Sequence, residues 1–291
     1  MSDTRSVRVA TAIGGGAIVL WSTFAVMAVI GRNIPAFQLL ALAFAVSGLS
    51  GLVVAAIRRT PFPRIPARVW AVGIGGLFGY HLFFFLALRN APPVEANLVN
   101  YLWPLLIVVI SGLLPGERLR PRHVIGAILG LIGTTMLIGG GTLVFHPADA
   151  WGFGLAALSA FIWAAYSVLS RRFGEVPTVA VAGYCTVSAI LALCAHAGLE
   201  TWVWPNKWEW LLVAALGFGP MGGAFYAWDV GMKKGDIRAL GGLAYVAPLL
   251  STLFLILGGF GVATVGVAIA AALIVGGGWL ASADVLSGKS R

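Results

Sequence analysis

The feature that most constrains this chain is a succession of apolar runs, each long enough to cross a lipid bilayer. A membrane helix needs about 20 consecutive apolar residues. Such runs follow one another over nearly all of the 291 residues, with short polar or proline-marked breaks. Only 10% of the residues are charged, whereas a soluble domain carries about a quarter. The pattern excludes an ordinary soluble protein and a disordered chain, and it predicts an all-α polytopic membrane protein.

Ten membrane spans are expected, because prolines and glycines interrupt the apolar pattern at regular places. The breaks include Pro35, Pro92-Pro93, Pro121 and Pro147. We interpret the first run as a membrane span and not as a cleaved signal peptide, since it is longer than the apolar core of a typical signal sequence. The expected helices cover residues 8–31, 36–57, 69–89, 94–114, 122–140, 151–171, 178–198, 209–231, 238–258 and 262–283.

The distribution of basic residues predicts the orientation of these spans. With the N-terminus placed inside, only Arg32, Arg89 and Lys207 fall in outer segments, which leaves 16 of the 19 Lys and Arg residues on the inner side. Cytoplasmic loops carry such an excess, so both termini are expected in the cytoplasm. Topology accounts for the net charge of +9. Neither nucleic acid nor another anionic partner is therefore expected.

A weak internal repeat predicts two structurally related halves. Tyr101–Leu106 (YLWPLL) matches Tyr245–Leu250 (YVAPLL) at an offset of 144, and Trp21 matches Trp163 at an offset of 142. Five spans per half is an odd number, so the second half must be inverted relative to the first. We expect the halves to cover residues 1–145 and 146–291 and to support alternating access around a midplane site. The alternative is chance similarity between apolar helices.

The aromatic residues divide into two groups by their depth in the expected spans. Trp21, Trp103 and Trp163 lie near the centres of their spans. The other tryptophans lie at or near the ends, where an interfacial belt is expected. This belt comprises Trp70, Trp151, Trp202, Trp204, Trp208, Trp210, Trp228 and Trp279.

Polar and aromatic side chains share single faces of three expected helices, in spans four, six and nine. Such faces should point toward a protein interior or a wet cavity. The alternative is ordinary helix packing by polar side chains, which also accounts for the glycine-rich stretch Gly73–Gly79. The predicted substrate-binding residues are Trp21, Tyr80, His81, Asn97, Asn100, Tyr101, Trp103, Trp163, Tyr166 and Tyr245.

Charged side chains are nearly absent from the middle of the expected spans. His81 is the exception, and it is either a packed neutral imidazole or a proton relay. Asp229, near Lys233 and Lys234, is expected to form an interfacial ion pair. A cationic substrate would call for a carboxylate at mid-depth, and a phosphorylated one for Arg or Lys. A net-neutral zwitterion with an apolar side chain suits an aromatic, amide-containing cavity better.

Two stretches carry a resemblance to a known family. They are Ala87–Asn97 (ALRNAPPVEAN) with Tyr101–Leu105 (YLWPL), and Gly116-Glu117-Arg118. With the five-plus-five pattern, they resemble the EamA type of the drug/metabolite transporter (DMT) superfamily, and in particular its YddG-type aromatic amino-acid exporters. The resemblance implies a bacterial inner-membrane exporter of aromatic and other neutral amino acids. We expect it to function as a monomer. Gly258-Gly259 stands where the second half would repeat the Gly-Glu pair.

Other functions are expected less from these residues. An exporter of drug-like compounds or other metabolites would share the same fold and cavity. An intramembrane enzyme would need a nucleophile–base pair or metal ligands within the spans, and the sequence offers no such pattern. No cofactor or metal is expected, and no phosphate-binding loop points to direct ATP drive. A scaffold without transport activity, facilitated diffusion and proton exchange all remain compatible with the sequence.

Overall fold

The computed structural model of this chain describes residues 2–24, 26–27, 33–115, 119–139, 146–259 and 264–286. Within these ranges all regular secondary structure is helical, and eight segments are long and apolar enough to cross a membrane. The expectation of an all-α multi-pass membrane protein is therefore confirmed. The motif Gly116-Glu117-Arg118 and the last residues of the first expected span lie outside the described residues.

The helices follow the expected apolar runs closely, although several runs contain two helices. Their bounds are α1 (Ser2–Ser22), α3 (Ala36–Ile57), α4 (Ala67–Ile74), α5 (Tyr80–Asn90), α6 (Pro93–Asn100), α7 (Trp103–Ser111), α8 (Pro121–Gly139), α9 (Ala150–Arg172), α10 (Ala180–Leu199), α11 (Lys207–Phe218), α12 (Ala224–Lys234), α13 (Ile237–Leu243), α14 (Val246–Leu257) and α15 (Val265–Leu286).

Prolines mark the starts of several helices, as expected. Helix α3 follows Pro35, α6 begins at Pro93 and α8 begins at Pro121. A proline suits the first turn because its fixed φ is helical and its missing N–H has no intrahelical partner there. The same residue type therefore ends one span and starts the next.

Two expected helices are interrupted in the middle, which the sequence interpretation missed. The run 94–114 divides at Tyr101–Leu102, and the run 238–258 divides at Ala244–Tyr245. Pro104 and Pro248 lie just beyond these breaks. A proline cannot donate to the carbonyl four residues before it, and those carbonyls belong to Asn100 and Ala244, at the ends of α6 and α13. The interruptions follow from the two prolines.

Two other expected helices contain a π-helical turn. Gly75–Gly79 joins α4 to α5, and Gly219–Gly223 joins α11 to α12, 144 residues further along the chain. A π turn accommodates one extra residue and rotates the face that the following helix presents. A Cβ atom at Gly76 would overlap the ring of Tyr166. The interpretation of this glycine-rich stretch as close packing is confirmed at that position.

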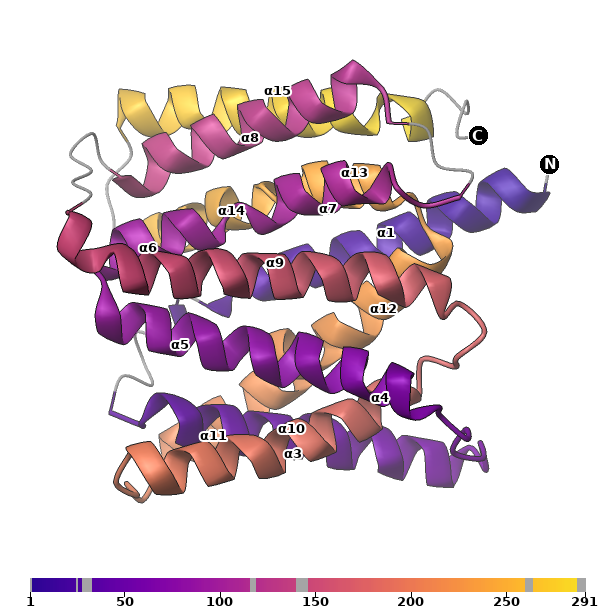
Figure 1. Cartoon of the computed structure of the whole chain (residues 1–291), viewed down its shortest axis with the longest axis vertical. Coiled ribbons are helices and arrows are strands. Elements are labelled where there is room, and N and C mark those ends of the chain that lie inside the picture. Colours follow the sequence, from indigo (N-terminus) through magenta and orange to yellow (C-terminus); the bar gives the residue numbers. More distant parts are fainter. Residues whose placement is uncertain are drawn as a thin grey trace.

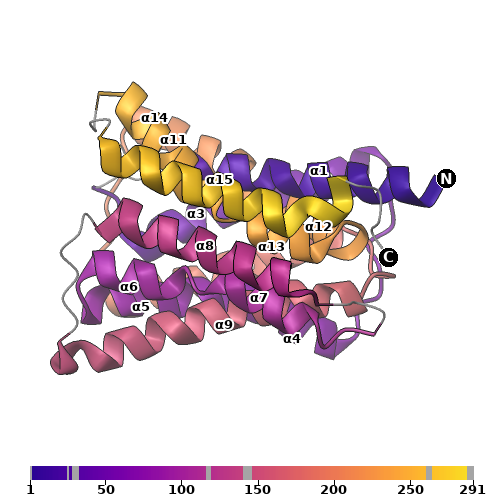
Figure 2. The same ribbon diagram turned by 90° about the horizontal axis from the view of Figure 1, so that it is seen from above.

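The helices run side by side in one bundle (Figure 1). Helices α8 and α15 form one edge of this view, α3, α10 and α11 form the other, and α1, α7, α9 and α12 lie between them. Contacts are most extensive between α8 and α15, α3 and α10, α1 and α12, and α5 and α9. Helix α1 begins and α15 ends at the same end of the bundle (Figure 2). We call this end the terminal end, and the end where α5 meets α6 the opposite end.

Candidate functional site

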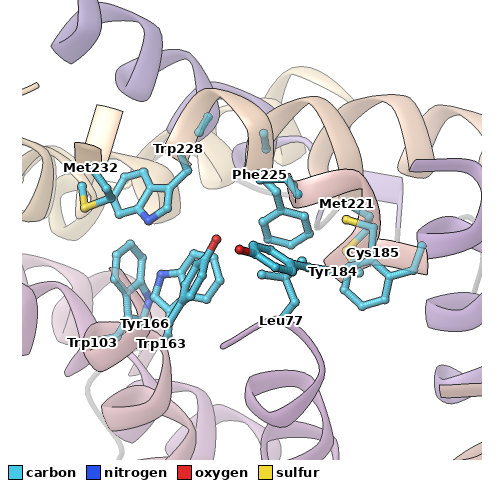
Figure 3. Packing of buried hydrophobic residues seen from close by; sticks show 14 of the residues in the cluster. Leu77, Trp103, Trp163, Tyr166, Tyr184, Cys185, Met221, Phe225, Trp228 and Met232 are labelled. Carbon is cyan, nitrogen blue, oxygen red and sulfur yellow. The ribbon is translucent and has the colours of Figure 1, made fainter. Parts of the chain in front are cut away.

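Five aromatic side chains from four helices meet in the centre of the bundle, and we call them the ring cluster. Trp21, Trp103, Trp163, Phe225 and Trp228 come from α1, α7, α9 and α12. Most of the ring pairs are edge-to-face or tilted, the geometry that aromatic quadrupoles favour. Figure 3 shows Trp163 and Trp103 facing Trp228. The structure therefore brings together all three tryptophans that were expected at mid-depth.

Distances within the ring cluster show that its members pack directly on one another. The ring centroids of Trp21 and Trp228 are 5.1 Å apart, and those of Trp21 and Trp163 are 5.6 Å apart. Only 3% of the Trp163 surface is exposed. A planar ligand entering this region would therefore exchange ring–ring contacts for its own.

Trp228 corrects the sequence interpretation, which assigned it to the interfacial belt. It is 1% exposed, and its indole N–H donates to the hydroxyl of Ser167 at 3.0 Å. The apolar segment extends from Lys207 to Lys234, further than expected at both ends. Trp228 therefore lies well inside the segment and not at its end. Most of the other belt tryptophans are exposed, as expected: Trp151, Trp202, Trp204, Trp208, Trp210 and Trp279.

Trp21 is anchored by the second π-helical turn. Its indole N–H donates to the carbonyl of Pro220 at 3.0 Å. The indole thus joins the end of α1 to the point where α11 passes into α12. Phe225, one turn after Pro220, contacts Trp21 and Trp163. The sequence interpretation missed Phe225, because a phenylalanine in an apolar helix does not stand out from its neighbours.

A network of side-chain hydrogen bonds fixes the amide of Asn100 beside the ring cluster. The amide N–H₂ donates to the hydroxyl of Tyr80 at 3.0 Å, and its oxygen accepts from the hydroxyl of Ser159 at 2.8 Å. The ring of Tyr80 in turn lies 5.4 Å from that of Trp163. Three helices, α5, α6 and α9, are joined through this one amide. Tyr80 and Asn100 therefore belong with the ring cluster, as expected.

His81 is buried among aromatic rings on the neighbouring face of α5. Its Nδ1 lies 2.6 Å from the carbonyl oxygen of Leu77, so this nitrogen carries a hydrogen and donates it. The rings of Phe44 and Phe225 pack against the imidazole at 5.4 and 6.2 Å. This geometry agrees with the packed-imidazole interpretation. The proton-relay interpretation stays a prediction.

The remaining predicted residues do not all reach the ring cluster. Tyr166 packs on Trp163 with 5.3 Å between centroids. Tyr245 instead lies in a separate hydrophobic group between α7, α8 and α15, where its hydroxyl donates to the carbonyl of Tyr101 at 3.2 Å. This bond joins the two proline-induced breaks. Tyr101 and Asn97 are half-buried, and the Asn97 side chain makes no hydrogen bond within the described part of the chain.

The expected ion pair of Asp229 is present, but it is buried. Nζ of Lys233 lies 2.8 Å from Oδ1 of Asp229, and the two side chains are 5% and 2% exposed. The pair lies in the last turns of α12, one residue beyond Trp228. No group of three His, Cys, Asp or Glu residues in the described ranges is arranged to hold a metal ion.

Aromatic faces, amides and hydroxyls dominate the chemistry of the centre. Ring faces can stack on a planar side chain or hold an ammonium by cation–π attraction. Amide and tyrosine hydroxyl groups can both donate and accept hydrogen bonds. The site is therefore suited to an uncharged or zwitterionic small molecule with an apolar part.

Comparisons with known proteins agree with this chemistry. The EamA-like transporter family matches residues 10–139 and 150–283 of the chain. The aromatic amino acid exporter YddG of Ancylobacter novellus is 52% identical over 277 residues, which cover 94% of this chain and 96% of that protein. The exporter of the same name from Escherichia coli K12 is 28% identical over 271 residues, covering 84% and 86% of the two chains. A solved crystal structure with 52% identity superposes with a TM-score of 0.92, covering 96% of this chain and 98% of that one.

Proposed function

The chain belongs to the EamA-like transporter family, and from this premise we propose that it exports amino acids, aromatic and other neutral ones, across the bacterial inner membrane. The observation that carries the proposal is the ring cluster, with the amide of Asn100 hydrogen-bonded beside it. The full-length similarity to a protein named aromatic amino acid exporter supports it. Transport, and not catalysis, is the activity that we assign.

The half-buried residues of the site are the ones that we expect to touch the substrate. Trp21, Tyr80, Asn97 and Tyr101 retain exposed surface, while the larger part of the ring cluster is buried behind them. We assign the substrate-binding role to all ten residues predicted from the sequence except Tyr245, and we add Phe225 and Trp228. Tyr245 is assigned the structural role of joining the two helix breaks.

We further propose that ten spans form two inverted halves, covering residues 1–145 and 146–291. The packing of the helices supports this arrangement. Helices α3 and α8 each pack against their own counterparts, α10 and α15. The pair α1–α12 has its counterpart in the pair α9–α5. The offset of 144 between the two π-helical turns is the offset of the sequence repeat.

In this arrangement the eight strongly apolar segments are completed to ten spans by α1 and α15. The terminal end of the bundle then faces the cytoplasm, because it holds most of the Lys and Arg residues. Inverted halves around a central site support alternating access. We propose that one chain is sufficient for it, since both halves are present in this sequence.

Counterflow in proteoliposomes tests the proposed activity directly. Vesicles loaded with unlabelled phenylalanine should accumulate labelled phenylalanine, and threonine and methionine should compete. Repeating the assay with and without an imposed pH gradient separates proton exchange from facilitated diffusion. Absence of flux for all three amino acids would contradict the proposal. Competition by planar cationic dyes, without competition by amino acids, would instead identify an exporter of drug-like compounds.

A further inference from the structure

The buried pair of Asp229 and Lys233 holds α12 against the connection between α9 and α10. The second carboxylate oxygen of Asp229 accepts from the hydroxyl of Thr178 at 2.8 Å. Nζ of Lys233 donates to the carbonyl of Val176 at 2.9 Å. A buried ion pair contributes little net stability compared with apolar packing of the same volume. The stability of the ion pair therefore does not explain the arrangement. Its distinctive feature is that both charged residues also bind the connection between α9 and α10.

A second cation strengthens the same boundary from the side of α9. The guanidinium of Arg171 donates to the carbonyls of Met232 and Gly235 at 3.1 and 2.8 Å. These carbonyls lie at the end of α12, where the helix dipole favours a cation. The contacts close the terminal end between α12 and the α9–α10 connection. We call them the terminal clamp, which consists of Arg171, Val176, Thr178, Asp229 and Lys233.

A corresponding set of contacts closes the opposite end, and we call it the opposite clamp. The carboxylate of Glu200 accepts from the backbone N–H groups of Phe37 and Gln38 at the start of α3. The same carboxylate accepts from Arg89 at 2.7 Å and from Nδ1 of His196 at 2.9 Å. The Arg89 guanidinium also lies 5.5 Å from the ring centroid of Phe37. The ends of α3, α5 and α10 are thereby joined.

One cationic residue of each clamp occupies an equivalent position in the sequence repeat. Lys233 follows Arg89 by 144 residues, and each is in the last turn of its helix, α12 or α5. Asp229 is equivalent to Phe85, whose ring packs on Phe37 at 5.4 Å. In both halves, therefore, the end of the helix that follows the π-helical turn contacts the beginning of a neighbouring helix. The end of α5 contacts the start of α3, and the end of α12 contacts the residues just before α10. One half uses a buried ion pair where the other uses rings and Glu200.

We propose that Asp229 and Lys233 are gating residues, whose contacts with Thr178 and Val176 must break to admit substrate from the terminal end. The inference rests on the proposed transport function and on the orientation given above. Trp228 and Phe225 of the ring cluster are on the same helix as the pair. Release of the clamp frees α12 to carry these two rings away from Trp21 and Trp163. The Arg89–Glu200 contacts hold the opposite end closed in the same step.

Thiol labelling reads the state of each clamp without any substrate. The background is the full-length chain with Cys185→Ala and Cys194→Ala. The reporter for the terminal end is Ser170→Cys, because Ser170 is buried on α9 beside Arg171. The reporter for the opposite end is Ala41→Cys, buried one turn after Phe37 on α3. A membrane-impermeant maleimide is applied to inverted and to right-side-out vesicles.

In the Ser170→Cys reporter, Lys233→Gln should raise the labelling rate from the terminal side about tenfold, as expected for the loss of one charge-assisted hydrogen bond. Ala41→Cys should remain protected in the same variant. Lys233→Arg, which can still donate to Val176 and Asp229, should keep Ser170→Cys protected. Lys234→Gln removes the same charge from the same turn at an exposed position, and it should match the reporter-only protein. Arg89→Gln should raise labelling of Ala41→Cys only.

If Lys233→Gln fails to fold, Thr178→Val decides the question, since it removes one contact across the boundary and leaves the ion pair intact. Unchanged labelling of Ser170→Cys in the folded Lys233→Gln or Thr178→Val proteins would overturn the proposal. An equal rise of both reporters would also overturn it, because that result indicates general loosening. Failure of the amino-acid flux assay would reject the proposed function. The labelling assay uses no substrate, so its result would still show whether the terminal clamp opens and closes.

Discussion

At the scale of single residues, the centre of the protein depends on indole rings whose N–H groups find acceptors inside the protein. Trp21 donates to the carbonyl of Pro220, and Trp228 donates to Ser167. A buried indole N–H without an acceptor would be costly. These bonds therefore fix the orientation of the two indole rings within the ring cluster.

Trp163→Ala and Tyr101→Ala should lower amino-acid flux about tenfold or more, because each removes an aromatic contact from the proposed site. Both proteins should still be produced in folded form, as judged by size-exclusion chromatography in detergent. Trp279→Ala is the matched control, since this tryptophan is exposed on α15. Control-level flux in the first two variants would remove these positions from the site.

Trp228→Phe should lower the free energy of unfolding by about 1 kcal/mol, the typical net value of one buried hydrogen bond. Ser167→Ala should have a similar effect. The double variant should cost less than the sum, because both changes remove the same bond. Thermal unfolding of the purified protein in detergent provides the comparison. Additive effects would show that the bond between the two side chains contributes nothing of its own.

The sequence predicted the residues of this centre in part. Trp103 and Trp163 were identifiable because an indole at mid-depth contrasts with its apolar surroundings. Trp228 was missed because its apparent position depended on where the apolar segment ends, and the segment continues to Lys234, three residues beyond the expected end. Tyr245 was placed at the centre by the sequence, whereas its ring packs between α7, α8 and α15. Helical phase gives a direction and not the neighbour that lies in that direction.

At the scale of helices, the features that the sequence analysis did not predict are the helix breaks and the π-helical turns. The breaks at Tyr101–Leu102 and Ala244–Tyr245 could have been derived from Pro104 and Pro248. The π-helical turns could not, because glycine-rich stretches in apolar helices are equally typical of ordinary close packing. Their equivalent positions in the two halves point to a shared role in directing α5 and α12 toward the centre.

Gly76→Ala should be far more disruptive than Gly75→Ala, although both changes lie in the same π-helical turn. A Cβ atom at Gly76 would overlap the ring of Tyr166, whereas a Cβ at Gly75 meets nothing within 4 Å. We expect Gly76→Ala to cost about 1–3 kcal/mol by overpacking, and Gly75→Ala to be neutral within experimental error. The two variants are compared by thermal unfolding in detergent, and amino-acid flux is the second measurement. Equal effects would contradict the close approach of α9 to this turn.

At the scale of the whole molecule, the repeat and the charge distribution predict a topology that any single helix leaves open. Equivalent connections in inverted halves must lie on opposite sides of the membrane. Arg58 and Thr201 follow equivalent helices, α3 and α10, and Asn90 and Lys234 end α5 and α12. All four side chains are exposed. They form two pairs in which the repeat and the membrane side can be tested together.

Single cysteines can be placed at these four positions in the background without Cys185 and Cys194. One position from each half should then be labelled from the same side of the membrane. In intact cells an impermeant maleimide should reach Asn90→Cys and Thr201→Cys, which lie at the opposite end of the bundle. Arg58→Cys and Lys234→Cys should react only after the inner membrane is opened, because the terminal end carries the excess of basic residues that retains a segment in the cytoplasm. If Arg58→Cys and Thr201→Cys were labelled from the same side, the halves could not be inverted. Alternating access by exchange of the two clamps would then lose its geometric basis.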